Sequence, residues 1–288
     1  MVVLVTGANG QLGQSLQFVA ENYPQIDFVF CDSTQLDIVN LEQVKHVFEQ
    51  IKPNFCINTA AYTAVDKAES EPEKAELINV TGVKNLAEIC KENDVVLLHI
   101  STDFVFDGNK KSPYTERDIP NPTGIYGQTK LEGENILRAI WNKHFIIRTS
   151  WVYSQFGHNF MKTMLRLASE RNSISVVNDQ IGTPTNAVDL AEILVQIILQ
   201  NHQQPNQNLF GFYHFSNEGE CSWYEFAKEI FKQKQVQITL NAITTAEFPT
   251  LAKRPAFSVL DKSKLKETFG IQISDWKSSL KKELHRVM

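Results

Sequence analysis

A short hydrophobic run followed at once by a glycine-rich turn opens the chain, and this feature restricts the possible folds most strongly. Val2 to Thr6 is a β-branched stretch of the kind buried in parallel sheets, and Gly7, Gly10 and Gly13 follow it. The apolar residues after the turn recur at the spacing of an amphipathic helix. A strand, a glycine turn and a helix N-terminus in this order are typical of dinucleotide-binding folds, because backbone amides and the helix dipole can hold a pyrophosphate there.

The N-terminal half continues this alternation of strand-like and helix-like segments. We expect strands at 27–31, 55–60, 95–101 and 145–149, and helices at 40–50, at 73–92 and around Tyr126. Asn40, with Gln43 three residues later, is placed to cap the first of these helices. Such alternation predicts an α/β protein with a Rossmann-type, doubly wound parallel sheet and ligands at the carboxyl ends of its strands.

The pattern is looser after residue 150. We expect helices at 160–171, 187–200 and 222–233, strands at 174–178 and 212–215, and an irregular tail that contains prolines. Residues 1–150 are therefore predicted to form the dinucleotide-binding Rossmann domain. Residues 151–288 are predicted to form mostly a smaller substrate-binding lobe, with some segments completing the Rossmann sheet.

Composition excludes several classes of function. A net charge of −5 and the lack of a lysine-rich patch argue against nucleic acid as the partner. No segment approaches the ~18 uninterrupted apolar residues of a membrane span, and the N-terminus is predicted to be a core strand, so a cytoplasmic protein is expected. The four cysteines occur singly in apolar settings, which indicates reduced core residues: Cys31, Cys56, Cys90 and Cys221.

The segment Tyr126-Gly-Gln-Thr-Lys130 follows the strand that ends at Thr102. Residues four apart lie on one face of a helix, so the Lys130 ammonium can reach the region where the Tyr126 phenol acts. A nearby cation is expected to lower the phenol pKa and suit it to proton exchange with a carbonyl oxygen. Tyr224 and Lys228 have the same spacing, but no strand with a terminal hydroxyl precedes them, and we interpret them as structural.

Asp32 ends the second predicted strand, 19 residues beyond Gly13. A carboxylate at this place can accept hydrogen bonds from the adenosine ribose and would repel a 2′-phosphate, which favours NADH. A cap for a turn is the alternative role of Asp32.

Five blocks of the sequence resemble the extended short-chain dehydrogenase/reductase family: residues 58–69, 101–108, 126–134, 148–153 and 179–185. The resemblance covers nearly the whole chain. It implies an oxidoreductase that reduces the 4-keto group of dTDP-4-dehydro-L-rhamnose to dTDP-L-rhamnose with NADPH or NADH. That reaction belongs to nucleotide-sugar biosynthesis for cell-surface polysaccharides, with a nucleotide sugar as substrate.

The same resemblance assigns roles to individual residues. It implies that Tyr126 donates a proton, that Lys130 serves both Tyr126 and the nicotinamide ribose, and that Thr102 donates a hydrogen bond to the reacting oxygen. Substrate contacts are implied for Thr102, Asp103, Trp151 and Arg254. Cofactor contacts are expected for Gly7, Gly10, Gln11, Leu12, Asp32, Asp37, Ile38, Ala61, Tyr62, Thr63, Tyr126 and Lys130.

The chain departs from the family pattern in some places. Some members bind magnesium at a subunit contact through acidic residues, where this chain has Ser15 and Val188, so no metal is expected and a homodimer is left open. Two alternatives stay open: another nucleotide-sugar reductase, epimerase or dehydratase of the same fold, and a non-catalytic protein like the regulatory subunit of methionine adenosyltransferase. A dehydratase would carry an Asp-Glu pair after the strand-end threonine, but Asp103 is followed here by Phe104.

Overall fold

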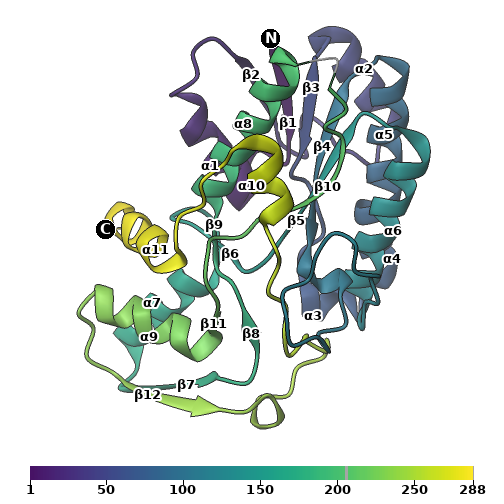
Figure 1. Ribbon diagram of the computed structural model, residues 1–288. Coiled ribbons are helices and arrows are strands. Elements are labelled where there is room, and N and C mark those ends of the chain that lie inside the picture. Colours follow the sequence, from purple (N-terminus) through teal and green to yellow (C-terminus); the bar gives the residue numbers. More distant parts are fainter. Residues whose placement is uncertain (205–206, 288) are drawn as a thin grey trace.

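The computed structural model describes residues 1–204 and 207–287, and it begins with the predicted strand, turn and helix (Figure 1). β1 (Val2–Thr6), α1 (Gln11–Ala20) and β2 (Asp27–Cys31) form the first βαβ unit. The side chain of Asn40 accepts a hydrogen bond from the Gln43 amide and caps α2 (Leu41–Ile51). The other elements of the N-terminal half include β3 (Phe55–Asn58), β4 (Val96–Thr102), α6 (Ile125–Ile140) and β5 (His144–Thr149).

In the described residues, the central sheet has six strands in the order β10-β5-β4-β3-β1-β2, and all pairings among them are parallel. Its edge strand β10 (Gly211–His214) comes from the C-terminal half. The register pairs Thr6 with Asn58 and Thr102 with Thr149, so the carboxyl ends of β1, β3, β4 and β5 lie along one edge. This arrangement confirms the predicted Rossmann-type class, a fold in which ligands generally bind at this edge of the sheet.

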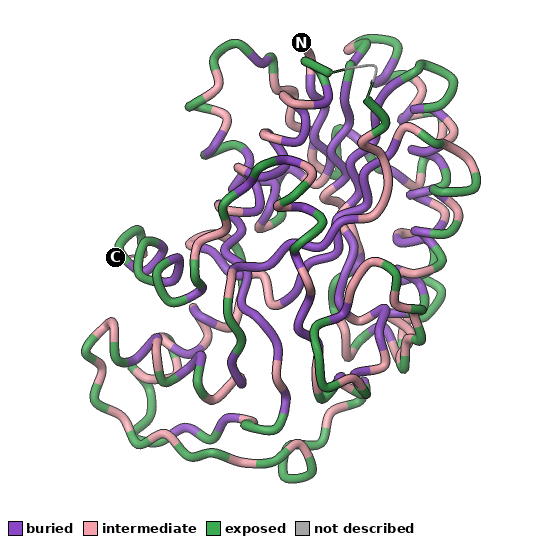
Figure 2. The backbone as a smooth tube through the Cα atoms, in the orientation of Figure 1, coloured by how far each residue is buried: buried purple, intermediate pink, exposed green. Residues whose placement is uncertain are grey.

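Side chains that alternate along the strands build one apolar core on each face of the sheet. Val3 and Val5 of β1 pack with α1 and α8 (Ala187–Gln203), whereas Leu4 packs with α2, α5 (Gly82–Glu92) and α6. Figure 2 shows the strands as buried tubes between these helical layers. The four cysteines are buried and free, as expected.

The predicted helix at 73–92 is interrupted. It consists of α4 (Pro72–Glu76), a π-helical turn η1 (Leu77–Thr81) and α5. Asn79 in this turn uses its side chain to bond both backbone groups of Tyr62, at 2.9 and 3.2 Å, and the Thr129 hydroxyl of α6 at 3.1 Å. These tertiary bonds give a physical reason for the wider turn, which apolar periodicity does not reveal.

The tail expected to be irregular contains regular structure, so that prediction was wrong. It forms β12 (Thr239–Ile243), α10 (Ser263–Phe269) and α11 (Trp276–Arg286). Asp275 caps α11, and Trp276, Leu280 and Leu284 pack into the C-terminal core. Only this narrow stripe of α11 is apolar, because lysines and other polar residues fill the rest of the helix.

The C-terminal core joins α7 (Phe160–Glu170), α9 (Trp223–Gln233) and α11, and it lies beside the strand pair of β7 (Ser173–Val177) and β12 (Figure 1). In contrast, α8 and β10 pack with the central sheet. A domain boundary near residue 150 stays a prediction.

None of the helices in the described residues is both long and apolar enough to cross a membrane. Short elements complete the fold: α3 (Val65–Ala68), η2 (Asp103–Val105), β6 (Val152–Tyr153), β8 (Ile181–Gly182), β9 (Thr185–Asn186), β11 (Cys221–Ser222) and η3 (Thr245–Glu247).

Candidate active site

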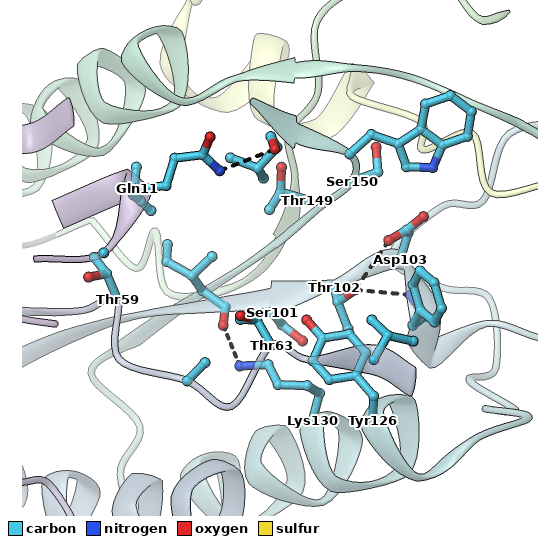
Figure 3. Close-up of a pocket in the computed structure, with 18 of the residues that line it drawn as sticks. Gln11, Thr59, Thr63, Ser101, Thr102, Asp103, Tyr126, Lys130, Thr149 and Ser150 are labelled. Carbon is cyan, nitrogen blue, oxygen red and sulfur yellow. Dashed lines mark hydrogen bonds between the residues drawn. The ribbon is translucent and has the colours of Figure 1, made fainter. Parts of the chain in front are cut away.

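Two adjoining cavities lie at the carboxyl ends of the central strands. The larger has a volume of about 650 Å³, and the smaller, of about 280 Å³, reaches from the glycine turn to the end of β2. Asn9, Gly10, Thr59 and Ala61 line both. Figure 3 shows the larger cavity, with Gln11 on one side and Tyr126 and Lys130 on the other. The strand ends therefore open on one elongated site, as the sheet topology requires.

The glycine turn has the shape that a bound pyrophosphate needs. Gly7 has φ +67°, and a Cβ atom there would lie 2.7 Å from the backbone nitrogen of Ala60. A Cβ atom at Gly13 would lie 2.5 Å from the Gly7 carbonyl oxygen, so α1 packs closely on the turn. Gly10 precedes α1 without a side-chain cap, which leaves the first amides of the helix facing the cavity end. These residues fit a dinucleotide.

Asp32 lies at the other end of the smaller cavity and also caps a turn. Its Oδ1 accepts hydrogen bonds from the Thr34 amide at 2.9 Å and the Thr34 hydroxyl at 2.6 Å. Its Oδ2 accepts one from the side chain of Asn9 at 2.7 Å. The bonds from Thr34 hold the pKa of Asp32 below its ordinary value, so the carboxylate keeps its charge beside the cavity.

Tyr126 and Lys130 both point from α6 into the larger cavity, towards the end of β4 (Figure 3). Burial raises the pKa of Tyr126 to about 12, with Thr102 opposing and Asp103 adding to the rise. The expected lowering of the phenol pKa is therefore wrong, because burial dominates. Burial also lowers the pKa of Lys130 to about 8, against the opposing charge of Glu134. The Lys130 ammonium donates to the Ile100 carbonyl at 2.7 Å.

Thr102 and Asp103 lie together at the end of β4. The Thr102 hydroxyl donates to Asp103 Oδ1 at 3.1 Å and accepts from the Phe104 amide at 3.2 Å. Asp103 is 2% exposed, and burial raises its pKa to about 6 despite hydrogen bonds from Ser258 and Thr102. A hydroxyl and a weakly acidic carboxyl thus meet beside Tyr126.

Trp151 forms an aromatic wall of the cavity together with Trp223 of α9. The two rings stack with centroids 3.6 Å apart and an interplanar angle of 11°. The backbone of Trp151 has φ +46°, and a Cβ atom at Gly182 would lie 2.6 Å from its indole ring. The ring is therefore held tightly between Gly182 and Trp223, which indicates a rigid wall.

Arg254 reaches the cavity from the segment that joins β12 to α10. Its guanidinium binds both carboxylate oxygens of Asp66 in α3, at 3.0 and 2.8 Å. The arginine lowers the pKa of Asp66. The pair joins the two sides of the site in a bidentate geometry.

Most of the residues predicted from the sequence line these cavities: Gly7, Gly10, Gln11, Leu12, Asp32, Asp37, Ile38, Ala61, Thr63, Thr102, Asp103, Tyr126, Lys130, Trp151 and Arg254. Tyr62 is not among the lining residues. It is buried between α3 and α4, and its phenol donates to Glu71 at 2.9 Å. Its contact with a cofactor stays a prediction.

The structure adds lining residues that the sequence reasoning missed. Thr59 follows β3, Thr149 is the last residue of β5 and Ser150 follows it, so their places at the ends of predicted strands could have identified them. His158 and Trp223 come from loops and helices far along the chain, without a local pattern. Tyr224 packs in the C-terminal core and Lys228 is exposed, so this second pair lies outside both cavities.

The comparisons with known proteins agree with this geometry. The family described as RmlD substrate binding domain matches residues 1–288. The dTDP-4-dehydrorhamnose reductase of Aggregatibacter actinomycetemcomitans is 46% identical, over 97% of each chain. A crystal structure of the Clostridium acetobutylicum dTDP-4-dehydrorhamnose reductase is 43% identical with a TM-score of 0.93, covering 100% of this chain and 99% of its own.

A structure of the Bacillus anthracis dTDP-4-dehydrorhamnose reductase in complex with NADP is 41% identical with a TM-score of 0.93, and covers 99% of each chain. The family model, the related sequences and the solved structures therefore match nearly the full length of the chain. The chain belongs to the RmlD substrate binding domain family, and it is similar over nearly its full length to these dTDP-4-dehydrorhamnose reductases.

Proposed function

We propose that this protein reduces the 4-keto group of dTDP-4-dehydro-L-rhamnose to dTDP-L-rhamnose with NADPH or NADH. The observation that carries the proposal is the convergence of Thr102, Tyr126 and Lys130 on the cavity that begins at the glycine turn. The names of the similar full-length proteins support the same sugar. The proposal also places the protein in the cytoplasm, with its nucleotide-sugar substrate and its cofactor.

A bound nicotinamide cofactor would supply the hydride. Gly7, Gly10 and Gln11 would hold its pyrophosphate, and Asp32 its adenosine ribose. The raised pKa of Tyr126 keeps the phenol protonated at neutral pH, as a general acid must be. The phenol would donate its proton to the alkoxide that forms at C4, because an alkoxide is more basic than a phenolate.

The neighbouring residues would position the sugar and stabilise the developing charge. Thr102 would donate a hydrogen bond to the same oxygen, and Lys130 would stabilise the phenolate left by proton transfer. Trp151 would pack against the sugar, and Arg254 would bind the diphosphate. Ser15 and Val188 cannot act as carboxylate ligands, so we propose a reaction that needs no metal ion.

The direct test measures NAD(P)H oxidation with dTDP-4-dehydro-L-rhamnose and with the corresponding UDP- and GDP-sugars. We expect turnover with the dTDP-sugar and formation of dTDP-L-rhamnose. Turnover only with another nucleotide would identify a different nucleotide-sugar reductase. Tight cofactor binding without turnover of any of the sugars would favour the non-catalytic alternative.

A further inference from the structure

A buried histidine lies directly beneath the lysine of the site. His99 of β4 is 0% exposed, and its Nε2 atom is 3.3 Å from the Nζ atom of Lys130. Its Nδ1 atom is 3.1 Å from the Nδ2 atom of Asn58. His99 does not line the cavity, so it cannot contact a substrate, but it contacts a residue that can.

His99 is the last member of a polar ladder that crosses three neighbouring strands. Thr6 pairs with Asn58 in the register of β1 and β3, and Asn58 pairs with His99 in the register of β3 and β4. All three side chains are almost completely buried. Buried polar groups of this kind must satisfy one another, so the position of each proton in the ladder can be deduced.

A backbone amide determines which groups of the ladder donate hydrogen bonds and which accept them. The Ala60 N–H donates to Asn58 Oδ1 at 3.1 Å, and the Thr6 hydroxyl donates to the same oxygen at 2.7 Å. A backbone N–H can only donate, so the atom of Asn58 that faces Ala60 must be its oxygen. The NH₂ group of Asn58 therefore faces His99 and donates to Nδ1. Neutral His99 must then carry its proton on Nε2.

This proton lies between His99 and Lys130. An ammonium group has only N–H donors, and one of them already bonds the Ile100 carbonyl at 2.7 Å. A second ammonium donor would meet the His99 N–H donor. A neutral amine, in contrast, has a lone pair that can accept from Nε2–H. The ladder thus opposes the charged form of Lys130 on the side facing the sheet.

We propose that His99 is a positioning residue that presents an N–H to Lys130, weakens its ammonium form and directs its free N–H groups into the cavity. The proposal rests on the proposed function for the role of Lys130, but not for the arrangement of protons. Strand β4 would then influence the charge of Lys130 through His99, in addition to carrying Thr102 at its end.

Other titratable groups near Lys130 also affect the pKa values of Lys130 and His99. Glu134, on the same helix, raises the pKa of Lys130, but its carboxylate is bound by Arg148 of β5 at 2.8 and 2.6 Å. Burial, Lys130 and His144 lower the pKa of His99 well below its ordinary value, so this ring stays neutral. The remaining titratable groups on helix α6 and on the elements around it include Tyr126, Asp103 of η2, Glu69 after α3, and the surface pair Lys84 and Glu88 of α5.

The tautomer of His99 can be measured directly in the wild-type protein. Long-range ¹H–¹⁵N spectra of protein labelled in histidine distinguish an Nε2–H ring from an Nδ1–H ring. We expect His99 to be neutral and protonated on Nε2 from pH 5 to pH 9. An Nδ1–H ring, or a titration of His99 within this range, would overturn the proposal even if every variant failed to fold.

The effect on Lys130 is tested by NMR titration of lysine labelled at ¹³Cε, with the Lys130 signal identified by its loss in Lys130→Met. The substitution His99→Gln removes the Nε2–H donor that faces Lys130. The introduced amide oxygen can then accept a hydrogen bond from the Lys130 ammonium. The Lys130 pKa should then rise by about one unit. Asn58→Asp should move the His99 proton to Nδ1 and raise the same pKa.

His144→Gln is the matched control, because His144 is a buried histidine of the adjacent strand that bonds the Trp141 carbonyl instead of Lys130. It should leave the Lys130 pKa unchanged. An unchanged or lower Lys130 pKa in His99→Gln would refute the proposal. Neither titration uses a nucleotide sugar, so failure of the proposed reaction would be recognised separately, in the turnover assay.

Discussion

Burial raises the pKa of Tyr126 to about 12, so the phenol stays protonated at neutral pH and is available as a proton donor. Tyr126→Phe should therefore keep the fold and cofactor binding but lose most turnover, since general acid catalysis typically contributes ~10²–10⁴-fold. Steady-state kinetics and NAD(P)H fluorescence titration measure the two effects. Tyr224→Phe is the control and should have nearly normal turnover. Near-normal turnover in the Tyr126 variant would remove this residue from the mechanism.

Asp103 links the site to the pH dependence of stability. Burial raises its pKa from 3.8 to about 6, so the folded state favours the neutral acid. This contribution is fully present below pH ~4 and is lost as pH rises through about 6, at a cost on the order of 3 kcal/mol. Asp103→Asn cannot ionise. In urea unfolding at pH 4 and pH 8, the variant should gain stability relative to wild type as pH rises. A constant difference would show that Asp103 ionises without penalty.

Asp32 has two roles that one substitution can separate. Asp32→Asn keeps an oxygen for the amide and hydroxyl of Thr34 and removes the charge beside the cavity. We expect a higher Michaelis constant for NADH and an equal or lower one for NADPH, because repulsion of a 2′-phosphate is lost. Initial rates with each cofactor give both constants. Equal weakening for NADH and NADPH would identify Asp32 as a structural cap alone.

The residues of the site differ in how far sequence reveals them. Tyr126, Lys130 and Asp32 belong to patterns with fixed spacing next to predicted strands, so their location could be predicted. The pKa of Tyr126 could not, because it depends on burial that spacing does not report. Trp223 enters the site through the packing of α9, and His99 contacts Asn58 of β3 and Lys130 of α6. Such tertiary contacts leave no local signal in one sequence.

Secondary structure was predictable where one period dominated a segment. The strands of the central sheet are continuous apolar runs, and the predicted and observed bounds differ by only a few residues. The π-helical turn η1 depends on the bonds of Asn79 to Tyr62 and Thr129, which lie far apart in the sequence. Helix α11 was missed because its apolar stripe is narrow and becomes visible only against the C-terminal core.

Helix α6, which carries Tyr126 and Lys130, packs closely against η1. A substitution at this contact measures how strongly the position of α6 is restricted. A Cβ atom at Gly133 would lie 2.3 Å from the backbone oxygen of Asn79, so Gly133→Ala must push the two elements apart. Overpacking of this kind costs about 1–3 kcal/mol, and urea unfolding measures it. Turnover should also fall, because α6 would shift.

Gly82→Ala is the matched control for this helix glycine. The three atoms nearest to its Cβ atom would all belong to the Ile38 side chain, which can shift more easily than backbone, and alanine favours the helix. We therefore expect a smaller loss of stability in Gly82→Ala than in Gly133→Ala. Equal losses in the two variants would show that backbone contact with η1 does not limit the position of α6.

On the scale of the whole molecule, the site is shared between segments distant in sequence. Residues of the first βαβ unit, of α6 and of the C-terminal half line one cavity. Two short hydrogen bonds from Arg254 to Asp66 connect the C-terminal half to α3 at this cavity. The sequence placed Arg254 near the substrate by resemblance, but its partner Asp66 could be found only from the fold.

Arg254 is expected to bind the diphosphate of the substrate without taking part in hydride transfer. Arg254→Met should then raise the Michaelis constant for the nucleotide sugar by roughly 10–100-fold, because a hydrogen bond to a charged group contributes about 1.5–3 kcal/mol. The turnover number and the affinity for NAD(P)H should change little, since the lost interaction is the same in ground and transition states. Lys253→Met is the control, because Lys253 is exposed and does not line the cavity, and it should have normal constants. A fall in turnover number with an unchanged Michaelis constant would instead indicate that Arg254 acts on the reaction itself, through its hold on Asp66 and the shape of the cavity.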